Sequence, residues 1–348
     1  MKAPECGSEL GLGRGWLIAC IACAVVSCDD AGSKPAKVDL VVTGAGLPVL
    51  TDWQCPAGWR VTPGFVDENG IENVPDGVAG FSICEPPEQL VCDEGSAQFL
   101  GTSTCSRLGT ECPPERFLGE VEIRALASGF EGSIVYVDPE AASDGDGSRA
   151  APRQRISDAV LSAASGGIVA LAPAIHVEEV TLADDIALVG ACVTETVIEA
   201  PDFRRDAGTI NLLGAAASLV ANLRVTGPRM GIWARRAGLE TRIESVEIDA
   251  VAGYGIIVMG PARAFLDEVV IRDTLLFRDT DSEGYGFVVF NGGEAVLDDV
   301  VLERNRTHGV VAYDPGSVLE AHDLIIRATE LQCAVKRQDA GLGLHVHP

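Results

Sequence analysis

The feature that most constrains the fold of this chain is a repeat of about 23 residues in its C-terminal two-thirds. Each unit begins with a glycine that opens a short apolar segment, and a second apolar segment follows about 15 residues later. The glycines are Gly208, Gly231, Gly255, Gly286 and Gly309, at spacings of 23, 24, 31 and 23 residues. The one long spacing reflects an insertion at residues 274–284. A single unit cannot bury its apolar segments alone, so the units must stack and share an interior.

The length of the repeat selects among repeat architectures. It is too short for a pair of helices or for a propeller blade. A leucine-rich repeat has a similar length, but its Leu-x-x-Leu-x-Leu pattern with asparagine is absent. The pattern therefore predicts an all-β chain, folded over residues 133–348 as a right-handed parallel β-helix. Its coils would stack about 4.8 Å apart, the ordinary spacing of neighbouring strands.

Stacking of the coils predicts which charged residues become neighbours. Equivalent positions after the second apolar segment hold Asp249, Arg272, Glu303 and Arg327, so the sign alternates from coil to coil. Opposite charges on adjacent strands can pair. We expect a ladder of ion pairs on the surface, which contributes little stability.

The segment before the repeat predicts a capped end. Residues 156–163 are apolar at Ile156, Ala159, Val160 and Ala163, the spacing of a short amphipathic helix. Such a helix would cover the open N-terminal end of the β-helix, where strand edges are otherwise exposed. Just upstream, Asp144 and Asp146 flank a glycine and offer carboxylate oxygens to Ca²⁺. We favour a solvated turn there, and hence no cofactor, with Ca²⁺ as the alternative.

The N-terminal segment, residues 1–27, has the pattern of an export signal. Arg14 precedes an apolar run over residues 16–26, which is too short for a membrane span of about 20 residues but suits a signal-peptide core. The run ends in Val-Val-Ser-Cys28, which resembles the lipobox of bacterial lipoproteins. This resemblance implies cleavage before Cys28 and lipidation of its sulfur, so that the lipid is the contact with the membrane. Residues 28–52 would be a tether, and the protein would lie in the cell envelope, on the outer membrane or cell surface.

A Cys-rich region, or collar, at residues 53–120 follows the tether. Its cysteines are Cys55, Cys84, Cys92, Cys105 and Cys112. In an exported chain such clustering predicts disulfides, and the absence of Cys-x-x-Cys pairs and of histidine in this region argues against a metal knuckle. We expect a Cys55–Cys84 bond and local pairing of the others. Cys192 and Cys333 would then be free or would pair between chains.

The segment from residue 134 resembles a known family. It contains Ile134-Val-Tyr-Val-Asp138, the Gly/Asp turn, the helix after Pro152, the apolar strand at residues 167–171 and a Leu188-x-Gly190 coil. This order resembles the N-terminal module of pectin-lyase-like right-handed β-helix proteins, and with the lipobox and collar it resembles bacterial β-helix lipoproteins. Proteins of this fold include polysaccharide lyases, glycoside hydrolases and non-catalytic adhesins, so the resemblance implies the fold far more than the activity.

Charge and paired acids limit the possible activities. With 26 basic and 51 acidic residues the net charge is −25, which excludes nucleic acid as a partner. Asp298 and Asp299 resemble the paired carboxylates of polygalacturonase-like hydrolases, and His308 lies nearby in sequence. Asp267 and Glu268 hold the same position in another coil, however, so we favour a turn before a strand.

Aromatic residues favour recognition of a ligand. Tyr254, Tyr285 and His308 each precede a coil-opening glycine, so they should stack in one column, with Tyr313 nearby. Exposed aromatic rings bind sugars, and the insertion at residues 274–284 would form a wall of such a groove. The alternative is aromatic stacking inside the β-helix. We expect a non-catalytic β-helix for adhesion or for recognition of carbohydrate or protein; the second hypothesis is a lyase or glycoside hydrolase that acts on an acidic polysaccharide.

Overall fold

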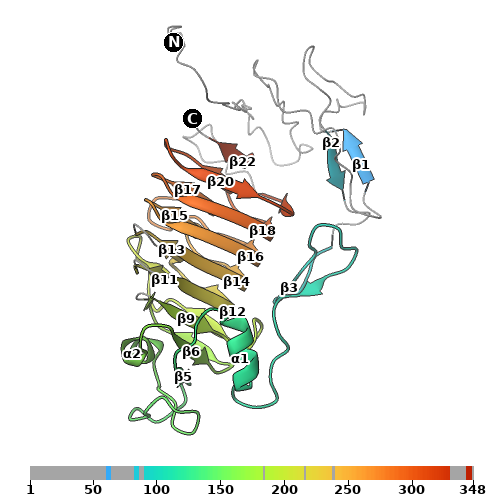
Figure 1. The fold of residues 1–348 in the computed structure, drawn as a ribbon. Coiled ribbons are helices and arrows are strands. Elements are labelled where there is room, and N and C mark those ends of the chain that lie inside the picture. Colours follow the sequence, from blue (N-terminus) through green and yellow to red (C-terminus); the bar gives the residue numbers. More distant parts are fainter. Residues whose placement is uncertain are drawn as a thin grey trace.

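The computed structural model describes residues 60–63, 82–85, 90–182, 185–214, 217–236, 240–329 and 342–346. The described residues from 134 onward form a parallel β-helix, as predicted, with strands stacked along one axis (Figure 1). Cys28, the rest of residues 1–59, Cys333 and the side chains of Cys55 and Cys84 lie outside this description. Among the residues described, neither helix is long and apolar enough to cross a membrane.

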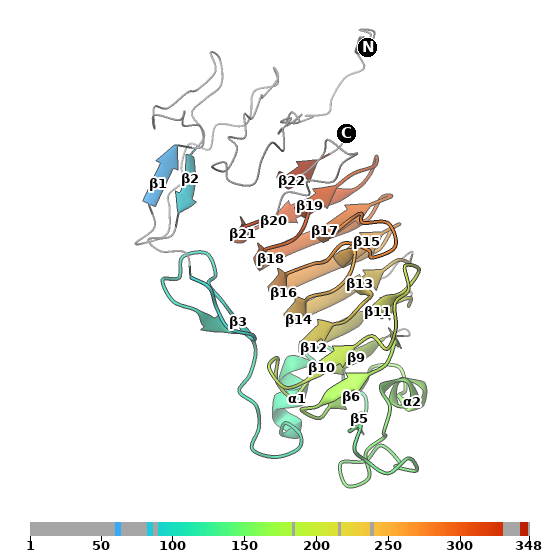
Figure 2. The same ribbon diagram turned by 180° about the vertical axis from the view of Figure 1, so that it is seen from behind.

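Two sheets form the walls of the β-helix. The larger has eleven strands, β5 (Ile134–Val137), β6 (Gly167–Leu171), β7 (Ile175–Val177), β9 (Ile186–Val189), β10 (Val197–Glu199), β12 (Ser218–Thr226), β14 (Glu240–Asp249), β16 (Arg263–Arg272), β18 (Glu294–Glu303), β20 (Val318–Ala321) and β21 (Leu324–Arg327). The smaller has seven, β8 (Val180–Leu182), β11 (Gly208–Leu212), β13 (Met230–Ala234), β15 (Tyr254–Met259), β17 (Tyr285–Phe290), β19 (His308–Ala312) and β22 (Leu342–Val346), seen in Figure 2. Every pairing within these two sheets is parallel, as between β14 and β16 or β15 and β17.

The register confirms the repeat in the sequence. Val246 pairs with Val269, Val269 with Val300, and Val300 with Leu324. The insertion at residues 274–284 does not disturb this alignment, because it leaves and rejoins the same coil. Aliphatic side chains from both sheets therefore meet in one continuous, fully buried interior.

Bends in the long strands recur at one position of each coil. A non-glycine residue there adopts the left-handed backbone conformation, and the residues are Asn222, Ser245, Glu268, Asp299 and Asp323, with φ between 47° and 57°. Short polar side chains tolerate this conformation better than most. Asp298 and Asp299 thus lie inside β18 at its bend, and the prediction that they form a turn before a strand is wrong.

Two helices cover the first coils. In α2 (Ile156–Ser162), Ile156, Ala159 and Val160 enter the interior, so this helix caps the N-terminal end as predicted. The Glu178 carboxylate accepts hydrogen bonds from the backbone N–H groups of Ile156 (2.6 Å) and Ser157 (3.1 Å) and so closes the start of the helix. The second helix, α1 (Glu120–Leu126), was not anticipated by the sequence analysis and packs on the outer face of the larger sheet.

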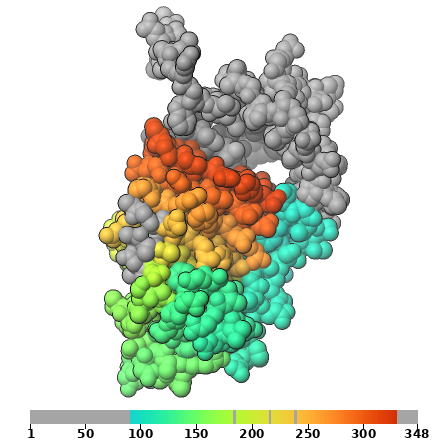
Figure 3. All heavy atoms as spheres, in the orientation of Figure 1, coloured from blue at the N-terminus to red at the C-terminus, as the bar shows by residue number. Residues whose placement is uncertain are grey.

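The described end of the Cys-rich region, residues 90–112, lies along the β-helix, and we call it the strap. It contains the antiparallel strands β3 (Ser96–Ala97) and β4 (Ser106–Arg107), while β1 (Arg60–Pro63) and β2 (Ser82–Glu85) pair upstream. Its apolar side chains pack on outward-facing Val193, Val270 and Val301. Figure 3 shows the strap, in cyan, against the side of the stacked coils.

Disulfides secure the strap. Cys92 and Cys105 form the expected local bond. Cys112, however, bonds to Cys192, 80 residues later, so the expectation that Cys192 is free or pairs between chains is wrong. Folding brings the loop after β9 to the end of the strap, a proximity that has no signature in the sequence.

The predicted charge ladder exists from Arg272 to Arg327, where it is largely buried, but Glu247 takes the place expected for Asp249 beside Arg272, and Asp249 lies 3.9 Å from Arg224 instead. Asp249, Arg272, Glu303 and Arg327 are aligned in register. Arg272 is only 3% exposed and lies between Glu247 (3.3 Å) and Glu303 (3.4 Å), while Arg327 contacts Glu303 at 2.6 Å. The expectation of a surface ladder is wrong because the strap covers these side chains.

The backbone of the strap adds hydrogen bonds to the ladder. Arg272 donates to the carbonyl oxygens of Ser96 (2.7 Å) and Cys92 (3.3 Å). The N–H group of Gly95 donates to the Glu247 carboxylate at 2.6 Å. Charges that would lose their water on burial are therefore paired with each other and with the strap.

A substitution in the ladder tests its burial. Glu303→Gln leaves the guanidinium groups of Arg272 and Arg327 without their shared carboxylate. We expect the free energy of unfolding to fall by about 3–5 kcal/mol, as when a buried ion pair loses one partner. Denaturant unfolding followed by circular dichroism measures this change.

The control is Glu294→Gln in the same strand. Glu294 pairs with Arg263 at 3.5 Å, and both side chains are about half exposed. This variant should change the free energy of unfolding by less than about 1 kcal/mol. Equal losses in the two variants would contradict a stabilising role for the buried ladder.

Candidate functional site

The predicted aromatic column exists at the start of three neighbouring strands. Tyr254 pairs in register with Tyr285, and Tyr285 with His308. Their ring centroids are 5.3 Å and 4.8 Å apart, in edge-to-face contacts. Phe277 from the insertion extends the series, 5.8 Å from Tyr254. We call Phe277, Tyr254, Tyr285 and His308 the aromatic row.

The insertion covers one end of the aromatic row instead of standing beside it as the wall of a groove. Phe277 is 2% exposed, and its ring fills the space that a side chain at position 253 would need. Gly253 has φ +77°, and a Cβ atom there would lie 2.1 Å from the ring. Thr274 fixes the start of the insertion by a 2.9 Å hydrogen bond to Asn305.

A second group of rings lies further along the smaller sheet. Met259 pairs in register with Phe290, and Phe290 stacks on Tyr313 with centroids 5.0 Å apart. The indole N–H group of Trp233 contacts the sulfur of Met259 at 3.1 Å, and the guanidinium of Arg235 lies 3.9 Å from the Trp233 ring centroid. Trp233, Met259, Phe290 and Tyr313 are half-buried, and we call them the aromatic strip.

Polar groups border both sets of rings. Burial and the nearby Glu283 carboxylate raise the pKa of the Tyr254 phenol. Burial and Asp314 raise the pKa of the Tyr313 phenol, with a smaller contribution from Glu283. Both phenols therefore remain protonated donors at neutral pH. Arg205 lies 3.6 Å from Glu283 and 4.7 Å from the centroid of Phe277.

The structure thus brings the three predicted tyrosines into one region and adds residues that sequence reasoning missed. Glu283 comes from the insertion, and Arg205 from the loop between β10 and β11. No motif marked Arg205, since its closeness to Glu283 depends on how the two loops fold. Together, rings, phenol donors, a carboxylate and a guanidinium form a surface able to stack against and hydrogen-bond a polar ligand.

The predicted catalytic residues do not form one constellation. Asp298 and Asp299 lie in β18 of the larger sheet, where Asp298 is exposed. His308 opens β19 of the smaller sheet, and its ring is buried against Tyr285. The acid pair and the imidazole therefore belong to different walls of the β-helix.

Stacking instead places carboxylates over one another. Glu244 pairs in register with Asp267, and Asp267 with Asp298. Burial and the neighbouring Asp298 raise the pKa of Asp267, and burial and Asp323 raise that of Asp299. Burial also raises the pKa of Glu244.

The predicted metal ligands do not converge. Asp144 and Asp146 are exposed, and a 2.8 Å hydrogen bond from the Ser148 N–H group to Asp146 lowers the pKa of that carboxyl. Within the described residues, three potential metal ligands come together only at Cys112, Cys192 and Glu195. Both sulfurs of that group belong to a disulfide.

Comparisons of the chain with protein-family models, with curated proteins and with solved structures find no match. The candidate site therefore rests on its geometry.

The packing of Phe277 against Gly253 is testable by substitution. Gly253→Ala and Gly292→Ala both place a methyl group on a residue with positive φ, at a cost of roughly 1–2 kcal/mol. Only Gly253→Ala also displaces the Phe277 ring, because nothing lies within 4 Å of a Cβ atom at position 292. We expect an additional loss of about 1–3 kcal/mol in unfolding free energy for Gly253→Ala. Equal losses would contradict the fixed position of the insertion.

The stacked carboxylates predict a dependence of stability on pH. Their pKa values are raised in the folded state, so protonation favours folding; this contribution is full below the unfolded pKa, near 4, and is lost as pH rises through the folded values. Asp267→Asn with Asp299→Asn removes two of the charges, and asparagine tolerates the left-handed backbone at 299. Thermal melts should show the double variant more stable than the wild type at pH 7, with the difference shrinking toward pH 4. A difference that grows on acidification would contradict this assignment.

Proposed function

We propose that this protein is displayed on the cell envelope and that its β-helix recognises carbohydrate without catalysis. The observation that supports this proposal is the aromatic strip beside the tyrosines, Glu283 and Arg205. The C–H faces of sugars pack on aromatic rings, while their hydroxyl groups pair with carboxylate, guanidinium and phenol groups. Rings of neighbouring coils are in contact, Tyr254 with Tyr285 and Phe290 with Tyr313, which suits an extended ligand.

The anchoring part of the proposal rests on the resemblance of the Val-Val-Ser-Cys28 segment to a lipobox. Lipid on Cys28 would hold the protein on the outer membrane or cell surface, and residues 28–52 would form the tether. Two or three acyl chains give stable membrane attachment, whereas one chain gives only marginal binding. The likeness of the N-terminal module to pectin-lyase-like β-helix lipoproteins supports the same picture.

A polysaccharide lyase or hydrolase is the second candidate function. The pKa of Asp299, which burial and Asp323 raise, favours it, because the general acid of such enzymes is a carboxyl with a raised pKa. Against it stands the bend position of Asp299, which explains the residue without catalysis. The separation of His308 from the acid pair is a further argument for binding.

Retention on immobilised polysaccharides tests the leading proposal. The oxidised chain from residue 29 onward would be applied to neutral and acidic polysaccharides, with and without Ca²⁺, and both retention and bond cleavage measured. We expect retention without cleavage. Tyr313→Ala should weaken binding by roughly tenfold, since it removes one half of the stacked pair with Phe290.

Phe265→Ala is the matched control. Phe265 is also half-buried and carries a stacked arginine, Arg263 at 4.8 Å, but it lies on the larger sheet. This variant should bind as the wild type does. Cleavage that is lost in Asp298→Asn or Asp299→Asn would establish the enzyme instead, and the absence of both retention and cleavage would contradict carbohydrate recognition.

A further inference from the structure

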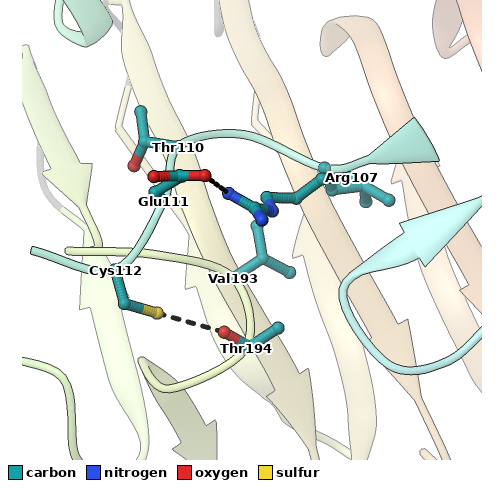
Figure 4. Close-up of a pocket in the computed structure, with 7 residues that line it drawn as sticks. Arg107, Thr110, Glu111, Cys112, Val193 and Thr194 are labelled. Carbon is teal, nitrogen blue, oxygen red and sulfur yellow. Dashed lines mark hydrogen bonds and ion pairs between the residues drawn. The ribbon is translucent and has the colours of Figure 1, made fainter.

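The two cysteines of the Cys112–Cys192 bond differ in their exposure. Cys192 is 1% exposed. Cys112 is half-buried and borders an open cavity of about 420 Å³ between the strap and the loop after β9 (Figure 4). The other lining residues are Arg107, Leu108, Thr110, Glu111, Val193 and Thr194. Since exchange begins with attack of a thiolate on one particular sulfur, a nucleophile in this cavity reaches Cys112 first.

Side chains around the bond affect its reactivity in opposite directions. The Thr194 hydroxyl lies 3.1 Å from the sulfur of Cys112 and 3.8 Å from that of Cys192, so it can donate to a sulfur that becomes negative. A hydrogen bond of this kind favours the thiolate and makes it a better leaving group. The Glu195 carboxylate, within 4.8 Å of both sulfurs, opposes the same charge.

We propose that Cys112 is a site of thiol–disulfide exchange with small-molecule thiols. A thiolate attacks the Cys112 sulfur, a new S–S bond forms, and the electron pair of the old bond leaves on Cys192. Cys192 then takes a proton from water. The products are a mixed disulfide on Cys112 and a thiol on Cys192, so the added thiol is the only co-reactant. The volume of the cavity falls within the range of small-molecule sites, roughly 300–1,000 Å³.

The strap stays in place when this bond opens. Thr110 remains bound to Asn222, which accepts from its backbone N–H (2.9 Å) and donates to its hydroxyl (2.8 Å). The buried ladder and the apolar contacts of Phe99 and Leu108 hold the rest of the strap. Exchange at Cys112 therefore modifies the folded protein reversibly, and it does not depend on the proposed carbohydrate binding.

Mapping of the exchanged sulfur tests the proposal. The full oxidised chain would be treated with 2-mercaptoethanol at neutral pH, quenched with acid, unfolded, alkylated and analysed by peptide mass spectrometry. We expect the mercaptoethanol adduct on Cys112 and the alkyl group on Cys192. The reverse distribution, or an intact Cys112–Cys192 bond after Cys92–Cys105 has exchanged, would overturn the proposal.

Substitutions of Thr194 and Glu195 test whether these side chains, and not the exposure of Cys112 alone, set the rate of exchange. Thr194→Val should slow the appearance of the Cys112 adduct by roughly ten- to a hundredfold, as expected for the loss of one hydrogen bond to a charged group, and Glu195→Gln should speed it. Thr102→Val in the strap, whose hydroxyl instead bonds to the Phe99 carbonyl, is the control and should not change the rate. Circular dichroism of each variant verifies the fold. Equal rates in all four proteins would show that Thr194 and Glu195 have no such role.

Discussion

Parallel pairing in register forces each coil of this β-helix to lie on its neighbour residue for residue. Val246, Val269, Val300 and Leu324 form one such column. Because the strands share hydrogen bonds along their whole length, a change of register in one coil would misplace every side chain in it. The apolar interior, the left-handed bend residues, the column of Tyr254, Tyr285 and His308 and the charge ladder are all of this kind.

The same register also aligns side chains on the outer face of the larger sheet. Stacking aligns outward-facing Val270 with Val301 and aligns Arg272 with Glu303, which gives one apolar and one charged column side by side. The strap covers both columns: its apolar residues pack on the valines, and its backbone hydrogen-bonds to Glu247 and Arg272. A buried ladder is costly without such partners, since each ion loses its water. The Cys92–Cys105 bond closes a loop within the strap, and the Cys112–Cys192 bond joins the end of the strap to the loop after β9.

The strap covers part of the larger sheet, whereas the rings on the smaller sheet stay half-buried. This difference favours a role of the smaller sheet in recognition. Its aromatic strip remains half-buried, with Glu283 and Arg205 nearby, whereas the insertion closes over one end of the aromatic row. One wall of the β-helix is thus sealed by its own chain, and the other presents rings and polar groups. The register confirmed the predicted column of Tyr254, Tyr285 and His308, but a further ring, Phe277, comes from the insertion that was expected to form the wall of a groove.

The sequence by itself determined everything that repeats. The period predicted the parallel β-helix, the alignment of Asp249, Arg272, Glu303 and Arg327, and the stacking of Tyr254 on Tyr285, because each of these follows from equivalent positions about 23 residues apart. The tertiary structure alone decided what covers the repeats. Burial of the ladder, the Cys112–Cys192 bond and the meeting of Arg205 with Glu283 join segments that share no period, such as Gln98 and Arg327, 229 residues apart. Such contacts depend on how the loops and the strap pack against the sheets of the β-helix, and no local pattern in the chain encodes this packing.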